Sequence, residues 1–206
     1  MPISAQHLKA ARLHLQNSDP TMKRILKAVG PCKLKTSPDR FLMLVNSILS
    51  QQISSAAAKT IHGRLVEDLK PAKISPDALV AYEVDELREL GISRQKAGYL
   101  LELAKQVHGE AVCLKKIGRL DDEGVILELT NIRGIGKWTS QMFLMFALGR
   151  LDVFPTDDLG IQNAIKKHYQ PRGTFDKKRM EKIAQPWRPY ATIASWYLWR
   201  SLDVEI

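Results

Sequence analysis

The chain has 206 residues, with 31 lysines and arginines against 22 aspartates and glutamates, a formal net charge of +9 at pH 7. A hydrophobic content of 45% excludes a disordered chain, and two cysteines are too few for a disulfide framework or a four-cysteine iron–sulfur cluster. The longest apolar run, residues 142–148, is too short to cross a membrane, and the start of the chain lacks an apolar signal region, so we expect an intracellular protein. The positive net charge predicts an anionic partner.

Apolar residues recur at spacings of three and four along the whole chain, which predicts helices. The predicted helices cover residues 3–16, 21–29, 40–52, 54–70, 75–82, 84–90, 93–107, 121–129, 138–148, 158–168, 176–187 and 189–202. No segment alternates as a strand does, and no low-complexity linker interrupts the pattern. The sequence therefore predicts an all-α fold in one domain, residues 1–206, with two lobes divided near residues 110–120.

Residues 129–139 are predicted to form a hairpin between two helices, with Gly134 and Gly136 in the turn. Glycine permits a tight turn and close approach of another backbone, and a helix start presents N–H groups that can bind an anion. Arg133 and Lys137 add positive charge on either side. We expect a DNA phosphate to bind Gly134, Gly136, Lys137 and Thr139; the alternative is an ordinary tight turn between helices.

The hairpin is followed by a loop with glycine and proline, residues 149–156, and then by Asp157. Together with residues 48–53 and the tail from Trp187 to Trp196, this pattern resembles the helix–hairpin–helix (HhH-GPD) superfamily of DNA glycosylases over roughly residues 38–200. Within it, the sequence is most similar to the 3-methyladenine DNA glycosylases, in a compact form without the extra N-terminal mixed α/β domain of some bacterial members.

The resemblance implies a two-lobed helical bundle that flips alkylated bases, 3-methyladenine and related methylated purines, out of double-stranded DNA. Such an enzyme hydrolyses the N-glycosidic bond in base excision repair and leaves an abasic site. It implies a monomer that acts in the cytoplasmic nucleoid of a bacterium or in the nucleus of a eukaryote. Two alternatives stay open: a glycosylase for a deaminated or mismatched base, and a non-enzymatic DNA-binding hairpin protein.

A carboxylate is expected at the reacting sugar, because breaking an N-glycosidic bond builds positive charge there. The resemblance selects Asp157, the second residue after the loop proline Pro155, as this catalytic residue. Without the resemblance, an aspartate here is more typical of a helix N-cap. Asp158 is the rival candidate and is expected in the first turn of the following helix, where acid suits the helix dipole.

A lysine nucleophile is expected to be missing. Relatives that also cut the DNA strand carry a hairpin lysine two residues past the second glycine, where this chain has Trp138. Lys137 lies one residue earlier, which turns its side chain about 100° away on a helix. The resemblance therefore implies a glycosylase without lyase activity, which uses water as its nucleophile.

A base pocket is expected from Trp138, Met142 and Trp196, because a cationic methylated purine gains a cation–π term on an indole. The alternative is that these side chains belong to the core, as we expect for Trp187 and Trp199. Gln52, or else Gln51, matches the position of the family's intercalating wedge, which fills the space that the flipped base leaves. Otherwise both are polar residues at a helix end.

The sequence predicts no side-chain metal site and no required cofactor. The family can hold a structural cation with hairpin carbonyls, which here would be those of Thr130, Ile132 and Ile135. The runs Lys166–Lys167 and Lys177–Arg179 are expected to be solvated faces.

Overall fold

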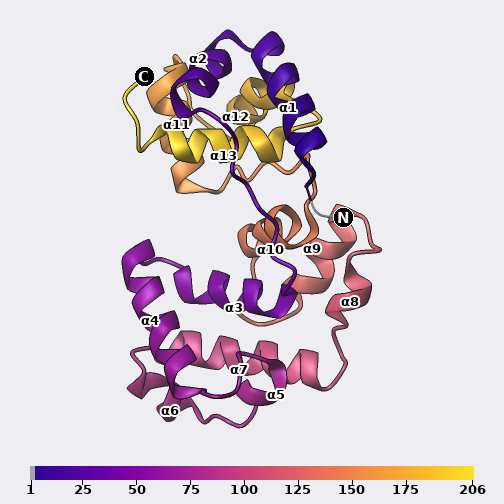
Figure 1. Cartoon of the computed structure of the whole chain (residues 1–206), viewed down its shortest axis with the longest axis vertical. Coiled ribbons are helices and arrows are strands. Elements are labelled where there is room, and N and C mark those ends of the chain that lie inside the picture. Colours follow the sequence, from indigo (N-terminus) through magenta and orange to yellow (C-terminus); the bar gives the residue numbers. More distant parts are fainter. Residues whose placement is uncertain (1–2) are drawn as a thin grey trace. The chain divides into compact units, whose positions relative to one another are not determined.

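The computed structural model describes residues 3–206, and within that range all regular secondary structure is helical (Figure 1). This confirms the predicted all-α fold. The chain forms two compact units. Unit 1 combines the described residues up to Thr36 with Leu148–Ile206, and unit 2 is Ser37–Ala147.

The division between the units differs from the predicted one near residues 110–120, which lie inside unit 2. The reason is a long-range contact that the sequence pattern does not signal. Helices α1 (Ala5–Ser18) and α2 (Pro20–Val29) pack against each other and against α13 (Ala191–Ser201). The first helices thus complete the core of the last ones, and the chain crosses between units twice.

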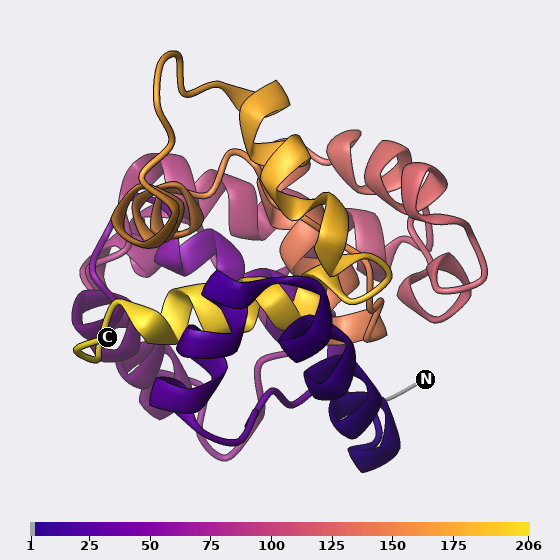
Figure 2. The ribbon, with the colours of Figure 1, turned by 90° about the horizontal axis from the view of Figure 1, so that it is seen from above.

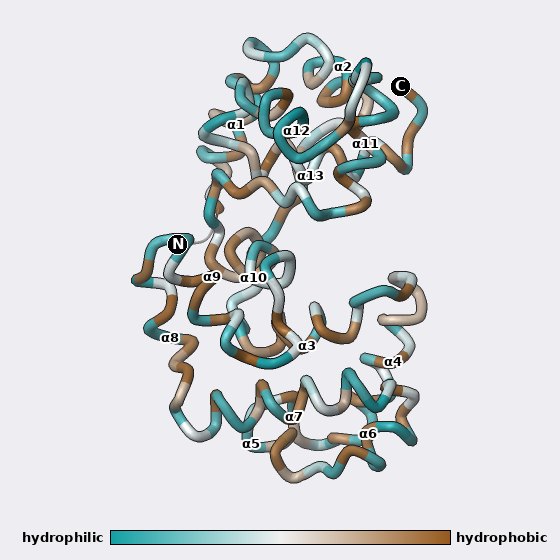
Figure 3. The backbone as a smooth tube through the Cα atoms, turned by 180° about the vertical axis from the view of Figure 1, so that it is seen from behind, coloured by the Kyte–Doolittle hydropathy of each residue, from teal (hydrophilic) through white to brown (hydrophobic). Residues whose placement is uncertain are grey.

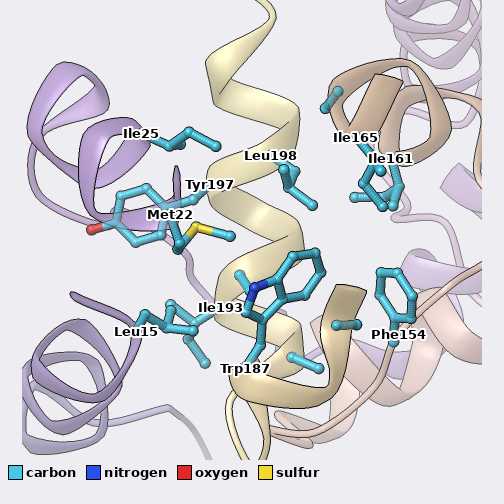
Figure 4. Close-up of a cluster of buried hydrophobic side chains, with 14 of the residues drawn as sticks. Leu15, Met22, Ile25, Phe154, Ile161, Ile165, Trp187, Ile193, Tyr197 and Leu198 are labelled. Atoms are coloured by element: carbon cyan, nitrogen blue, oxygen red, sulfur yellow. The ribbon is translucent and has the colours of Figure 1, made fainter. Parts of the chain in front are cut away.

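Unit 1 also contains α11 (Leu159–Tyr169), α12 (Lys177–Ala184) and a 3₁₀ turn, Gln185–Trp187. Its core surrounds Trp187, which is fully buried among aliphatic and aromatic side chains from several helices (Figure 4). The Trp187 indole donates a hydrogen bond of 2.8 Å to Asp19 Oδ2, and the Tyr169 hydroxyl donates another of 2.7 Å. Trp187 is therefore a core residue, as predicted, and its polar atom is satisfied by the carboxylate that caps α2.

Unit 2 is built around α3 (Arg40–Ser50), which packs against α4 (Ser55–Asp68), α7 (Arg94–His108) and α10 (Lys137–Phe143). The remaining helices of unit 2 are α5 (Pro76–Leu79), α6 (Val84–Glu89), α8 (Leu114–Ile117) and α9 (Asp122–Thr130). The buried apolar residues of α3 include the face predicted from its spacing: Phe41, Leu44, Val45, Ile48 and Leu49.

Three predicted boundaries change in ways that matter for the site. Helix α3 ends at Ser50, so both glutamines lie beyond it. The predicted helix 138–148 divides into α10 and a π-helical turn, Leu144–Leu148. Helix α11 begins at Leu159 and leaves Asp158 outside as its N-cap. In residues 3–206, no helix has the length and hydropathy needed to span a membrane.

Candidate functional site

The predicted hairpin is present in unit 2, where α9 ends at Thr130 and α10 begins at Lys137. Gly136 is the N-cap of α10 and supplies no side-chain cap. The N–H groups of a helix's first turn lack intrahelical acceptors and carry the positive end of its dipole. Arg133 and Lys137 are both exposed beside this turn. The hairpin can therefore bind an anion through backbone N–H groups and two flexible cations.

The two hairpin glycines have different reasons to be glycine. Gly134 has φ +94°, and a Cβ there would overlap the ring of Tyr99 on α7. The packing of unit 2 thus requires glycine at this position. Gly136 has an ordinary φ of −99°, and a Cβ there would meet no atom within 4 Å. Nothing in the fold of unit 2 requires glycine at 136, so the open side of this residue is available to an external group.

Gln51 braces the hairpin. Its Nε2 donates hydrogen bonds to the Gly134 carbonyl at 3.0 Å and to Thr139 Oγ1 at 3.3 Å. Thr139 is 2% exposed and its Oγ1 accepts from Gln51, so its predicted contact with a phosphate stays a prediction. Lys96 on α7 holds the end of α3 instead, because its Nζ donates to the Leu49 carbonyl at 2.8 Å. Burial lowers the pKa of Lys96.

Gln52 differs from Gln51 in its surroundings. It is exposed and has φ +56°, the left-handed region that is uncommon for a residue other than glycine. A cleft of about 610 Å³ lies beside it, lined by the turn that holds both glutamines, the start of α7 and hairpin residues 132–136. Of these two glutamines, Gln52 is the exposed one, and Gln51 is the one held by the hairpin.

The two candidate catalytic aspartates, Asp157 and Asp158 of unit 1, also differ in their surroundings. Asp158 is 8% exposed and caps α11, its Oδ1 accepting from the Ile161 N–H at 2.8 Å. The Trp199 indole donates to the same oxygen at 2.8 Å. A Cβ on Gly160 would lie 2.9 Å from Trp199 Cδ1, so glycine at 160 lets the indole approach this carboxylate. Trp199 is half-buried and does more than fill the core, its predicted role.

Asp157 is more open than Asp158, with 39% of its side chain exposed, and Lys177 Nζ lies 2.5 Å from its Oδ1. It is not the N-cap that the alternative interpretation expected, because that position belongs to Asp158. The turn is closed by the Asp158 N–H, which donates to the Pro155 carbonyl at 3.1 Å. A carboxylate fixed away from water exerts a stronger and better-oriented field than an exposed one. On this ground the geometry favours Asp158, while the assignment to Asp157 stays a prediction.

The predicted pocket residues are distributed over both units. Trp138 is half-buried and Met142 is buried, and they lie one turn apart on α10 in unit 2. Trp196 is half-buried on α13 in unit 1, with its ring edge-to-face against Tyr197 at 5.1 Å between centroids. It lies one helical turn from Trp199, the residue that contacts Asp158. Trp196 therefore lies on the same side of α13 as Trp199.

The candidate ligands for a cation are side-chain groups and the hairpin carbonyls. Among residues 3–206, no group of three or more His, Cys, Asp or Glu side chains is placed to hold an ion. Of the predicted hairpin carbonyls, that of Ile132 accepts a 3.0 Å hydrogen bond from the Ile135 N–H. A carbonyl oxygen has a second lone pair, so the Ile132 carbonyl could bind a cation in addition to this hydrogen bond. The cation site at the carbonyls of Thr130, Ile132 and Ile135 stays a prediction.

Three features of the site have no clear signal in the sequence: Lys96, Gly160 and the contact between Trp199 and Asp158. A glycine two residues after an aspartate is a weak local signal, and nothing near Lys96 in the sequence identifies its acceptor. The hydrogen bonds of Lys96 and Trp199 each join segments that lie far apart in the chain.

Comparison with known proteins gives a consistent result. Residues 45–189, more than two thirds of the chain, match the family described as HhH-GPD superfamily base excision DNA repair protein. The chain is 30% identical over 197 residues to the alkylbase DNA glycosidase-like protein mag2 of Schizosaccharomyces pombe, covering 93% of this chain and 92% of that protein.

Two solved structures are similar over nearly the whole chain. The 3-methyladenine DNA glycosylase Mag1 of Schizosaccharomyces pombe, in complex with abasic DNA, superposes with a TM-score of 0.87 at 30% identity, covering 95% of this chain and 97% of that one. A DNA-3-methyladenine glycosidase of Bacillus halodurans gives a TM-score of 0.78 at 33% identity, covering 92% and 87% of the two chains.

Proposed function

Because the chain belongs to the HhH-GPD superfamily of base excision DNA repair proteins, we propose that it is a monofunctional DNA glycosylase for alkylated bases. Its substrates are 3-methyladenine and related methylated purines in DNA, and its product is an abasic site. The observation that carries this proposal is the likeness, over nearly the full length of both chains, to a 3-methyladenine DNA glycosylase bound to abasic DNA.

DNA binding begins at the hairpin. The open face of Gly136, the uncapped first turn of α10 and the exposed Lys137 provide N–H groups and charge for one backbone phosphate. Such a contact positions the duplex without reading its sequence. The hairpin contact can therefore form at any DNA sequence.

Base flipping is assigned to Gln52, whose exposed side chain fills the vacated space and can hydrogen-bond the orphaned base. The flipped base stacks on the indole of Trp138 or of Trp196, and Met142 lies one helical turn from Trp138 on α10. A methylated purine carries positive charge, so stacking on an indole stabilises it by roughly 0.5–2 kcal/mol. The same charge makes the base a good leaving group and removes the need for a strong general acid.

The chemistry is hydrolysis of the N-glycosidic bond. As the bond to the base breaks, positive charge develops on the sugar, and a fixed carboxylate stabilises it and orients the attacking water. One of the adjacent residues Asp157 and Asp158 supplies this carboxylate. Asp158 is the more strongly oriented of the two, because the Ile161 N–H and the Trp199 indole both hold its Oδ1.

Incubation of the protein with methylated duplex DNA, followed by chromatography and mass spectrometry of the released bases, tests the proposal. Release of 3-methyladenine, with intact DNA strands left behind, is the expected result. Parallel assays use duplexes that contain uracil or a mismatched base. Release of only uracil or the mismatched base would mean that the enzyme acts on another class of lesion. DNA binding without release of any base would leave a non-enzymatic hairpin protein.

The partner in this proposal is double-stranded DNA that contains damaged bases, bound by one copy of the chain. The enzyme then acts where the chromosome is, in the cytoplasmic nucleoid of a bacterium or the nucleus of a eukaryote. Light scattering of the protein with and without a short duplex measures whether one copy binds one lesion.

A further inference from the structure

One segment of unit 1 concentrates the chain's positive charge. Residues 166–182 contain seven lysines and arginines and only two acids. Their net charge of +5 is more than half of the +9 of the whole chain. All seven basic residues are exposed. They lie at the end of α11, in the loop 170–176 that extends outward from the helices (Figure 2), and on α12, which is coloured as strongly hydrophilic (Figure 3).

The two acids of this segment are already engaged. Asp176 caps α12 by accepting from the Arg179 N–H at 2.8 Å, and Glu181 pairs with Arg188 at 3.4 Å, outside the segment. Within the part of the chain that the structure describes, no carboxylate lies in ion-pair range of Lys178, Arg179 or Lys182. Three cations of α12 therefore face solvent without compensation, an unfavourable arrangement that an anionic ligand would relieve.

The basic helix α12 begins next to the turn that carries Asp157 and Asp158. Lys177, its first residue, forms the ion pair with Asp157 described above, so the basic helix starts beside the candidate catalytic carboxylates of the same unit. A nucleotide whose sugar reaches Asp157 or Asp158 has its neighbouring phosphates only one nucleotide away. Lysine and arginine side chains on the adjoining helix are long enough to meet them.

We propose that Lys178, Arg179 and Lys182 of α12 form a second DNA-backbone surface, separate from the hairpin, that binds phosphates flanking the flipped nucleotide. The inference rests on the proposed function and replaces the expectation that Lys177–Arg179 is only a solvated face. The hairpin belongs to unit 2 and α12 to unit 1.

The experiment compares two triple variants with equal loss of charge. The first is Lys178→Gln, Arg179→Gln and Lys182→Gln on α12; Lys177 is left intact because it contacts Asp157. The control is Lys23→Gln, Arg24→Gln and Lys27→Gln on α2, three exposed cations of the same unit. Fluorescence anisotropy measures the affinity of each protein for a duplex with a tetrahydrofuran abasic analogue over a series of salt concentrations.

The α12 variant is expected to lower the slope of log affinity against log salt by roughly 0.9 for each phosphate that it no longer neutralises. The α2 variant keeps the wild-type slope, and both keep the wild-type Tm. An unchanged slope in the α12 variant overturns the inference, and so does an equal fall in the α2 variant, which would mean a general effect of net charge.

This readout is independent of catalysis. If the wild-type protein releases methylated bases and the slope does not change, only the α12 surface is wrong. If it releases no base and the slope still falls, the surface stands and the proposed function fails.

Discussion

The side-chain amide of Gln51 donates to the backbone carbonyl of Gly134 at 3.0 Å and so fastens the turn after α3 to the hairpin. These two elements carry different proposed tasks, the wedge at Gln52 and the phosphate contact at Gly136. Because a carbonyl at the turn of the hairpin accepts the bond, the two tasks are performed at a fixed separation within unit 2. Gln51 is thus a positioning residue, and the choice between the two glutamines has a structural basis.

Gln51→Ala is expected to destabilise the protein and to weaken excision on every substrate. The variant lacks the hydrogen bonds to Gly134 and Thr139, each worth roughly 0.5–1.5 kcal/mol. At about 2–4 °C per kcal/mol for a chain of this size, Tm should fall by several degrees. Calorimetry measures the shift, and an unchanged Tm would show that these bonds do not brace the hairpin.

Gln52→Ala is expected to leave Tm unchanged, since the side chain is exposed, and to slow excision selectively. Flipping a base from a stable pair costs a few kcal/mol, and less where pairing is already weak. Single-turnover rates should therefore fall more on a fully paired duplex than on one with a mismatch at the lesion. Equal losses on both duplexes would reduce Gln52 to a residue at a helix end.

Asp158→Asn is expected to reduce excision by at least roughly 10²-fold, the scale for losing one preorganised electrostatic group. Asparagine caps a helix about as well as aspartate, so the hydrogen bonds from Ile161 and Trp199 can be kept and Tm should change little. Single-turnover base release and calorimetry measure the two effects in the same variant.

Asp157→Asn is the matched control for that experiment, with the same change one residue earlier on the exposed side of the turn. It should retain most of the activity. The opposite pattern, a large loss in Asp157→Asn and none in Asp158→Asn, would restore the assignment made from the sequence. Comparable losses in both variants would mean that the two carboxylates act together.

Gly136→Asp is expected to weaken binding to all DNA sequences alike. The new Cβ meets no atom of the protein, so the fold should tolerate it, but the carboxylate stands where the phosphate is proposed to bind. Like-charge repulsion then opposes the contact. Anisotropy with several unrelated duplexes measures the effect, and unchanged affinity in the folded variant would remove Gly136 from DNA binding.

The sequence predicted local structure well because helix spacing and caps are local properties. The buried face of α3, the hairpin and the core position of Trp187 all follow from apolar periodicity and from glycine placement. The units could not be divided correctly, because α1 and α2 pack against α13 at the other end of the chain.

The site was less predictable for the same reason. Asp158 accepts a hydrogen bond from the Trp199 indole of α13, whereas Asp157 pairs with Lys177 of α12. Neither partner is part of the local sequence motif. The space that admits the indole depends on Gly160, whose significance appears only when Trp199 is placed beside it.

The hairpin should give no Schiff base, because Trp138 occupies the place where strand-cutting relatives have a lysine. The expected product is an intact strand with an abasic site, which breaks only after hot alkali, and borohydride added during the reaction should trap no protein–DNA adduct. Lys137 is the hairpin amine that could still form a Schiff base, since it is exposed at the start of α10 and its side chain is flexible. Gel analysis of the borohydride reaction, with Lys137→Ala as the control, measures this directly. An adduct that forms with the wild-type protein and disappears in Lys137→Ala would overturn the monofunctional mechanism while leaving base excision intact.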